Sequence, residues 1–398
     1  MRIIRIVCLT LSAFVPLILA GSCQVSQSFT GPYQDPIVSS KVPFARRGFG
    51  IQLWNNSWAC LPCEGGYPDY VYALDRLTCT NSNYIHVAAN VEMTDSANGS
   101  TFNRYSSTGV TPSDNRLQHL FSLLKARGFQ IEFKPGFWYN QTGWAMMNYV
   151  PADANAFFNN WQPQLVHYAS LAQACGVDVF DVSYEQSNLT YQYASQWIAL
   201  IAAVRSVYKG QVTANFQNFR EAEHATFLNL LDFVEVSCFY KYVSSTTPSE
   251  SQLEAGWQDT TNVPTWNPAT DAPYSGISAG NSIISEMNNL YAIANKPILI
   301  GDIAFISSHG AAANWNSNIN PNAVDLQGQS DQFEAFFKVF TDPTKVGPWF
   351  MGVTFLTWFP FDWMKNDHGS AEVGISGRSI RDKPAEKVVT DWYTGNGR

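Results

Sequence analysis

The chain has 398 residues, of which 45% are hydrophobic, 14% aromatic and 14% charged, and its formal net charge is −8. This length suits one α/β barrel as well as two average domains. Nucleic acid is not an expected partner, because binding it requires a basic surface that an acidic chain does not supply.

The first 20 residues have the features of a secretory signal peptide. Arg2 and Arg5 precede an apolar run over residues 6–19, and small residues follow at 20–22. The run is shorter than the roughly 20 residues that cross a bilayer, so we expect a secreted, extracellular protein without a membrane span. A lipoprotein anchored at Cys23 is the weaker alternative, because no large aliphatic residue stands three positions before it. Residues 21–46 form a polar leader, and residues 47–398 form one domain that is expected to act as a monomer.

The cysteines fit an exported chain. Disulfides among Cys60, Cys63 and Cys79 are favoured over zinc binding, because no second CxxC or His pair follows. Cys175 and Cys238 lie in apolar surroundings and are interpreted as core thiols. N-glycans would be permitted in a eukaryotic host at four sequons, Asn55, Asn98, Asn140 and Asn188.

From residue 48 onward, strand-like and helix-like patterns alternate. The expected strands are Gly48–Trp54, Tyr84–Val91, Phe129–Trp138, Val177–Tyr184, Gln211–Phe216, Phe233–Tyr240, Pro297–Phe305 and Trp349–Phe359. The expected helices are Asp114–Arg127, Ala156–Ala174, Tyr193–Tyr208, His224–Leu231, Ser278–Ala294 and Ser330–Phe340. Residues 94–113, 243–277 and 306–328 are expected to be irregular. This alternation predicts the α/β class and a single (β/α)8 TIM barrel, with its active site at the carboxyl ends of the strands.

Two of the expected strands end in or contain a carboxylate. The fourth strand leads into Glu185, and the seventh is interrupted at Asp302. Paired carboxylates suit glycosidic bond cleavage, because one protonates the leaving oxygen while the other attacks the sugar or activates water. The alternatives are a structural role for Glu185 as a salt-bridge partner of Lys134 or Arg220, and a loop-capping role for Asp302.

Other strand ends carry polar and aromatic side chains that a purely structural barrel does not require. Trp54, Lys134, Trp138 and Asn215 are expected to line the same cleft, where tryptophan faces stack on sugar rings. Asp181 is interpreted as a hydrogen-bonded structural carboxylate. The chain has no HExxH, GxSxG or phosphate-binding glycine loop, so no cofactor and no metal are expected.

Several strings, in this order along the chain, resemble glycoside hydrolase family 113. They include SYEQS, LDFVEVSCFYKY, WFMGVTFLTWFPFD and RDKPAEKVVTDWY, within residues 46–393. The resemblance implies an acid/base role for Glu185, with Asn215 at the polar end of the next strand. It also implies that Tyr240 holds the nucleophile and that Trp358 forms a sugar platform. The implied activity is hydrolysis of a polysaccharide or oligosaccharide, by analogy β-1,4-mannan or a related hexose polymer.

The sequence departs from the family at the second acid. Where the family has Thr-Glu followed by an apolar residue, this chain has Gly301-Asp302-Ile303. An aspartate withdraws the carboxylate by about 1.5 Å, one bond length. Retaining enzymes hold their carboxyls about 5–5.5 Å apart and inverting enzymes about 6.5–9.5 Å. A retaining enzyme is the preferred interpretation, and an inverting enzyme or a sugar-binding protein with little turnover are the alternatives.

Overall fold

The computed structural model describes residues 42–53, 68–95, 99–104, 111–139, 145–261, 277–313, 323–358 and 376–395. The signal peptide, most of the leader, Trp54, Cys60 and Cys63 lie outside these ranges. In the described part of the chain, no helix has both the length and the apolarity needed to cross a bilayer.

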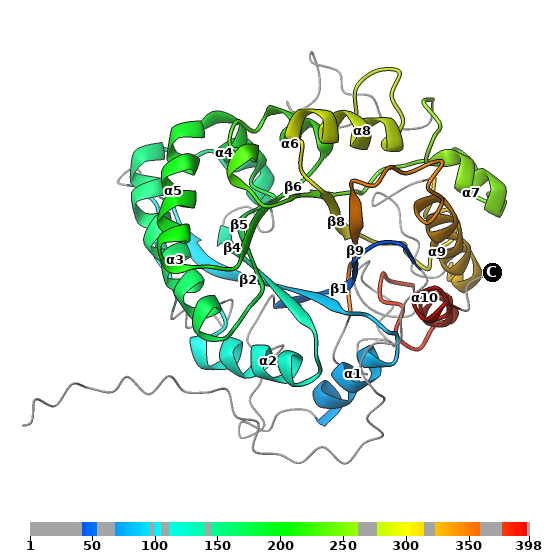
Figure 1. The fold of residues 1–398 in the computed structure, drawn as a ribbon, viewed down its shortest axis with the longest axis horizontal. Helices are drawn as coiled ribbons and strands as arrows, with labels where there is room; N and C mark the ends of the chain where they lie inside the picture. Colours follow the sequence, from blue (N-terminus) through cyan, green and yellow to red (C-terminus); the bar gives the residue numbers. More distant parts are fainter. Residues whose placement is uncertain are drawn as a thin grey trace, which may run out of the picture.

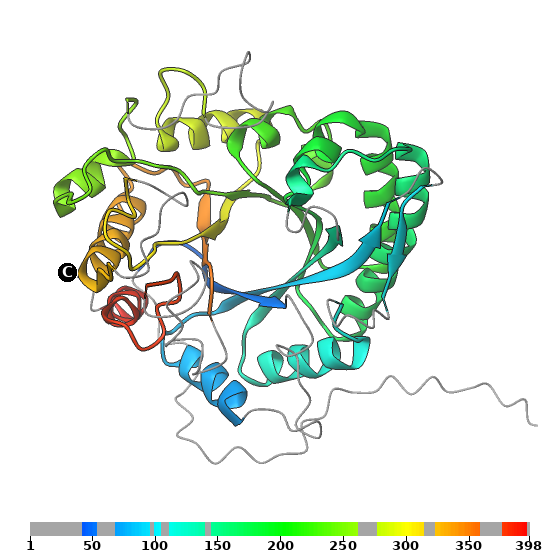
Figure 2. The same ribbon diagram turned by 180° about the vertical axis from the view of Figure 1, so that it is seen from behind.

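The parallel strands form a closed ring (Figure 1; seen from behind in Figure 2). These strands are β1 (Arg46–Leu53), β2 (Tyr84–Thr94), β4 (Gln130–Tyr139), β5 (Val179–Tyr184), β6 (Gln211–Phe216), β7 (Val234–Ser237), β8 (Ile298–Ile303) and β9 (Phe350–Phe355). Their order is β1-β9-β8-β7-β6-β5-β4-β2, and pairing of β1 with β2 closes the ring. The short β3 (Thr101–Asn103) adds an antiparallel pairing to β2. The predicted (β/α)8 barrel is therefore confirmed.

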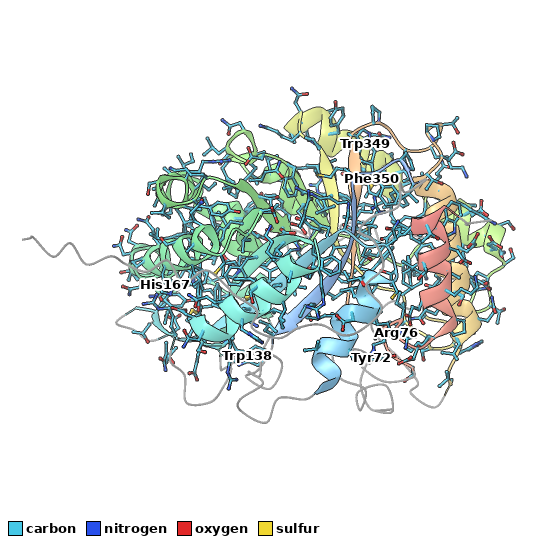
Figure 3. All side chains as sticks on the ribbon, turned by 60° about the horizontal axis from the view of Figure 1, so that its bottom comes forward. Tyr72, Arg76, Trp138, His167, Trp349 and Phe350 are labelled. Carbon is cyan, nitrogen blue, oxygen red and sulfur yellow. The ribbon has the colours of Figure 1, made fainter. Side chains whose placement is uncertain are left out.

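Helices surround the ring on the outside (Figure 1). They are α1 (Pro68–Thr78), α2 (Asp114–Ala126), α3 (Ala154–Ala174), α4 (Ser187–Gln192), α5 (Ala194–Val207), α6 (Phe219–His224), α7 (Glu250–Gly256), α8 (Ile283–Ala294), α9 (Leu326–Phe340) and α10 (Pro384–Thr394). Two 3-10 turns, η3 (Ala145–Asn148) and η4 (Leu228–Leu230), lie between them. Arg76 on α1 donates to both carboxylate oxygens of Glu386 on α10 at 2.7 and 2.8 Å, which joins the first helix to the last (Figure 3).

The sequence placed most elements correctly but missed several helices. The expected helix at 224–231 is wrong, because the Asn218 side chain accepts from the Glu221 backbone N–H and starts α6 at Phe219. Helix α7 was expected to be irregular, although Ser249 and Gln252 form a capping box at its start. Helices α1 and α10 were not predicted.

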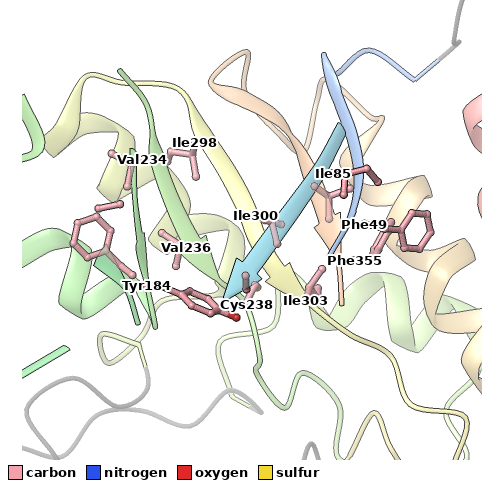
Figure 4. Packing of buried hydrophobic residues seen from close by; sticks show 14 of the residues in the cluster. Phe49, Ile85, Tyr184, Val234, Val236, Cys238, Ile298, Ile300, Ile303 and Phe355 are labelled. Atoms are coloured by element: carbon pink, nitrogen blue, oxygen red, sulfur yellow. The ribbon is translucent and has the colours of Figure 1, made fainter. Parts of the chain in front are cut away.

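Aromatic side chains fill the layer between strands and helices. Phe133 of β4 packs edge-on against Phe121 of α2 and Tyr168 of α3, with ring centroids 5.2 and 5.6 Å apart. Phe355 of β9 packs against α9 in the same way, and Figure 4 shows it beside Phe49 of β1. Burial of such rings supplies the main stabilisation of this layer.

Polar side chains lie inside the ring beside a small apolar cluster that includes Val179 and Leu299. Alternation along each strand separates these inward side chains from those that face the helices. On β4, Phe133 points to the helices, whereas Glu132 and Lys134 point inward and are fully buried. Lys134 hydrogen-bonds Glu235 of β7, a strand that is not adjacent to β4, so the two side chains meet across the ring. The barrel interior therefore contains charge, and this charge lies next to the predicted catalytic acids.

The three cysteines in the described ranges, Cys79, Cys175 and Cys238, form no disulfide with one another. Cys238 is buried, in agreement with its interpretation as a core thiol. Pairing of Cys79 with Cys60 or Cys63 stays a prediction, because both partners lie outside the described residues.

Candidate active site

Glu185 follows directly on β5, at the carboxyl end of the ring. Its φ of +50° is in the left-handed region, which residues other than glycine rarely adopt. The pairing of β5 with β6 also shifts register between Asp181 and Tyr184. Asp181 supports this irregularity, since its Oδ1 accepts from the backbone N–H groups of Ser183 and Asn215 at 2.7 and 3.3 Å. Unusual backbone at a strand end is a feature of functional sites, and Glu185 is 6% exposed.

Asp302 lies within β8 and points into the ring, so it does not cap a loop. Asn215 Nδ2 donates to its Oδ2 at 3.1 Å, and His86 Nε2 of β2 lies 3.4 Å from its Oδ1. The Tyr184 hydroxyl also hydrogen-bonds the Asp302 carboxyl, while Gln52 Nε2 donates to that hydroxyl at 3.1 Å. Asp302 is 1% exposed.

A chain of hydrogen bonds connects the two acids. Ser237 Oγ lies 2.5 Å from Glu185 Oε1 and 3.1 Å from Asn215 Oδ1, and Asn215 Nδ2 donates to Asp302. A hydroxyl carries a single hydrogen. When Glu185 is ionised, Ser237 donates to it; when Glu185 is protonated, it donates to Ser237 and Ser237 donates to Asn215. The same chain thus accommodates both protonation states of Glu185.

A layer of buried charge lies beside this chain. The Lys134 ammonium bonds Glu235 and is 4.0 Å from Asp302 Oδ2. Tyr84 donates to Glu132 Oε2 at 2.8 Å. Paired or hydrogen-bonded groups of this kind are the form in which charge is tolerated in a protein interior.

Two glycines make room for this layer. A Cβ at Gly301 would lie 2.0 Å from Oε1 of Glu235, and a Cβ at Gly50 would lie 2.2 Å from Nε2 of His86. Both positions therefore require the absence of a side chain. Gly301 directly precedes Asp302 and stands where the family has threonine. Its missing side chain leaves the space that Glu235 occupies.

One group of side chains has the donor atoms of a cation site. His86, Glu132 and Glu235 each place one donor atom within 4.8 Å of the others. The Lys134 ammonium already bonds Glu235 there, so the chain supplies its own cation to the group. This arrangement does not fit a metal ion, which would face the lysine charge at close range.

The environment changes the protonation of the site. Burial raises the pKa of Asp302 to about 7; Lys134 acts in the opposite direction and Glu185 adds to the increase. Burial and then Lys134 hold the pKa of His86 well below its ordinary range, so its imidazole is neutral. Burial raises the pKa of Tyr184 well above its usual value, which keeps the phenol protonated as a donor.

The structure distributes the predicted sugar-binding residues unevenly. Lys134 and Asn215 are fully buried beside Asp302. Trp138 is half-buried at the carboxyl end of β4, at the opposite end of the molecule from Trp349 and Phe350 (Figure 3). Trp54 lies outside the described residues. The sugar contacts of all these residues stay predictions.

Two residues that the family resemblance assigned lie elsewhere. The Tyr240 hydroxyl accepts from the Phe219 backbone N–H at 3.3 Å, and its ring stacks on that phenylalanine. The aromatic hydroxyl next to Asp302 is instead that of Tyr184, which lies at the same end of the barrel as Cys238 (Figure 4). Trp358 is fully buried, and its indole N–H donates to the Ala73 carbonyl at 2.9 Å.

Sequence reasoning missed several residues of the site. They are Gln52, His86, Glu132, Tyr184, Glu235 and Ser237. The strings QIEFK and FVEVS each place one carboxylate in the middle of an apolar strand. A charge at such a position points either to a helix layer or to the barrel interior. That signal marks Glu132 and Glu235 as interior residues, although it does not identify their partners.

A parallel barrel with two hydrogen-bonded acids at its carboxyl end has the architecture of a glycosidase. The sequence profile described as Glycoside Hydrolase Family 113 matches residues 58–373. This chain belongs to glycoside hydrolase family 113, as its sequence strings predicted.

Solved structures agree with the fold. The GH113 β-mannanase of Alicyclobacillus acidocaldarius, in complex with ManMIm, is 20% identical with a TM-score of 0.66, and the match covers 90% of this chain and 100% of that one. A second GH113 β-1,4-mannanase, also a complex, is 20% identical with a TM-score of 0.64, covering 88% and 99%. The Ruminococcus gnavus β-glucuronidase is 13% identical with a TM-score of 0.53, covering 88% of this chain and 50% of its own. No curated protein sequence matches this chain.

Proposed function

We propose that this chain is a secreted β-1,4-mannanase that retains the configuration of the anomeric carbon. The observation that carries the proposal is the hydrogen-bond chain from Glu185 through Ser237 and Asn215 to Asp302. In this chain Glu185 can exchange a proton with Ser237, and the Asn215 amide, a hydrogen-bond donor, orients the carboxyl of Asp302. The mannan substrate is suggested by the names of the two similar GH113 structures, and secretion by residues 1–20.

The proposed reaction has two steps. In the first, protonated Glu185 donates to the glycosidic oxygen while an oxygen of ionised Asp302 attacks the anomeric carbon; the leaving sugar departs as an alcohol. In the second, ionised Glu185 takes a proton from water, and the water oxygen displaces Asp302 from the sugar. Glu185 ends protonated and Asp302 ionised, so the site is regenerated.

One observation favours a second candidate. Asp302 is 1% exposed and its side chain is shorter than the family's glutamate. A carboxylate held this deep suits activation of a water, as in an inverting enzyme, or the loss of efficient turnover, as in a sugar-binding protein.

The test is reducing-end release from mannans, glucans, xylan and chitin-type polymers by the wild type, Glu185→Gln, Asp302→Ala and Asp302→Glu. We expect mannan cleavage that falls at least about 1000-fold in Glu185→Gln and Asp302→Ala. Asp331→Ala, a change on α9 away from the ring, is the matched control and should retain wild-type rates. Product anomers observed by NMR before mutarotation separate retention from inversion. A wild type that binds mannan without cleaving it, with activity gained in Asp302→Glu, would support the sugar-binding protein.

A further inference from the structure

Lys134 is a buried lysine that the sequence assigned to sugar binding. Its side chain is fully buried, its ammonium bonds Glu235, and it lies 4.0 Å from Asp302 Oδ2. The ammonium also lies 5.4 Å from the centroid of the Tyr184 ring. The contacts that fix it are thus inside the barrel, and its side chain has no exposed surface.

Acidic side chains outnumber Lys134 in the part of the barrel interior that surrounds it. Four carboxyl side chains in the barrel interior are 1% exposed or less: Glu132, Asp181, Glu235 and Asp302. Burial acts to lower the pKa of Lys134, but Asp302 and then Glu235 raise it well above its ordinary value. The lysine is therefore charged at neutral pH, and its charge lowers the pKa of Asp302, Glu235 and Asp181 against the effect of burial.

The groups that face Asp302 come from several strands. They are His86 of β2, Glu132 and Lys134 of β4, Tyr184 and Glu185 at the end of β5, and Asn215 of β6. Burial lowers the pKa of His86, so the histidine is neutral, and burial raises the pKa of Tyr184, so the tyrosine keeps its proton. Glu132 and Glu185 oppose ionisation of Asp302. Among these neighbours only Lys134 favours its anionic form through charge.

We propose that Lys134 is a positioning residue that keeps Asp302 in its anionic, reactive form from inside the barrel, while Glu235 fixes the lysine ammonium in place. The inference rests on the proposed function, because an ionised Asp302 is what the first reaction step uses. In this proposal Lys134 controls the ionisation of Asp302 and does not bind the sugar.

The test compares Lys134→Met with Lys134→Arg through the pH dependence of kcat and KM on mannan. The acid limb is the part of the pH profile in which kcat/KM rises as Asp302 ionises. Loss of the ammonium should move this limb to higher pH by about one unit or more. Activity at pH 6 should then fall about tenfold or more and partly recover at higher pH. KM should change little. Lys134→Arg keeps the charge and should keep the limb near its wild-type position.

Controls separate charge from folding. Lys125→Met removes a lysine that pairs with Asp178 on the outside of the barrel, and it should leave the limb unmoved. The double variant Lys134→Met/Glu235→Leu replaces the buried pair with apolar groups, an exchange that proteins often tolerate. It should fold, as judged by circular dichroism, and still show the shifted limb. A folded Lys134→Met or double variant with a wild-type acid limb, or a change confined to KM, would overturn the proposal.

Failure of the proposed function is distinguishable from failure of this inference. If the wild type cleaves no polymer, the charge on Asp302 is read directly by NMR titration of protein labelled with ¹³C at the aspartate carboxyl carbon, using Asp302→Asn to assign the signal. Lys134→Met should raise the pH midpoint of that signal by about one unit or more. An unchanged midpoint would overturn the inference whatever the activity.

Discussion

Asp302 combines a catalytic assignment with nearly complete burial. Because burial raises its pKa to about 7, and because the proposed first step needs its ionised form, kcat/KM should rise with pH through about 7. An exposed aspartate would place this limb near pH 4. A pH–rate profile on a manno-oligosaccharide measures it, and an acid limb at or below pH 5 would contradict this protonation state of Asp302.

Ser237 is the residue that connects the two acids. Replacing it with alanine removes the hydroxyl that contacts Glu185 Oε1 and Asn215 Oδ1. We expect Ser237→Ala to lower kcat roughly tenfold or more, because a buried hydrogen bond to a charged group is worth about 1.5–3 kcal/mol. Thr213→Val is the matched control, since that hydroxyl donates to the Phe233 carbonyl at 3.0 Å and takes no part in the chain. Equal kcat values for Ser237→Ala and the wild type would exclude the chain from catalysis.

At the scale of elements, the site depends on how closely β7 and β8 approach. The two strands pair with a register shift between Val236 and Ser237, which sets Ser237 opposite Asp302. Gly301, one residue earlier on β8, leaves the space that Glu235 occupies. The position of Asp302 therefore depends on a bulge in the pairing of β7 with β8 and on the missing side chain of Gly301 on β8 itself.

Gly301→Ala tests this packing. The new Cβ would lie 2.0 Å from Oε1 of Glu235, so either Glu235 moves away from Lys134 or β8 shifts. We expect a lower melting temperature and a loss of activity, because overpacking typically costs about 1–3 kcal/mol. Glu235→Ser alone removes the partner of Lys134 and should itself lower the melting temperature. Adding Gly301→Ala to Glu235→Ser should cost less stability than adding it to the wild type, because the Glu235 side chain no longer occupies the space. Wild-type melting temperature in Gly301→Ala would show that the strands accommodate the Cβ.

For the whole molecule, several buried acids make stability depend on pH. Burial raises the pKa of Asp302, Glu221 and Glu223 to about 7 each. A folded state with raised carboxyl pKa values binds more protons than the unfolded state between the ordinary values, near 4, and 7, so the free energy of unfolding falls as pH rises through that window. We expect the melting temperature to decrease from pH 5 to pH 8 in calorimetry.

Glu221→Gln checks the cause of that slope. Glu221 is fully buried, and its oxygens accept from Ser187 and Thr190 of α4 at 2.7 and 2.5 Å. An amide does not titrate, so the decrease between pH 5 and pH 8 should become shallower in the variant. Glu250→Gln, at the partly exposed start of α7, serves as the control and should reproduce the wild-type slope. If melting temperature falls with pH equally in Glu221→Gln and in the wild type, groups other than Glu221 produce the decrease.

The sequence by itself determined the barrel, the family, and the placement of Glu185 and Asp302 at or near strand ends. These features are local: apolar runs mark strands, periodic patterns mark helices, and a carboxylate that interrupts or follows a strand is visible in a few letters. Helix α7 escaped because its signal is a capping box and not apolar periodicity. Helix α10 does have that periodicity, since its buried residues Ala385, Val389 and Tyr393 recur every four positions, so the local pattern was sufficient to predict it.

Only the tertiary structure decided which side chains meet. Lys134 and Glu235 are 101 residues apart, and Ser237 and Glu185 are 52 apart. Partners across a closed sheet depend on strand register, and here β5 and β8 both carry register shifts that local patterns do not encode. For this reason the sequence placed Lys134 in the cleft and chose Tyr240 as the partner of Asp302, whereas the closed barrel buries the lysine and brings Tyr184 to the acid.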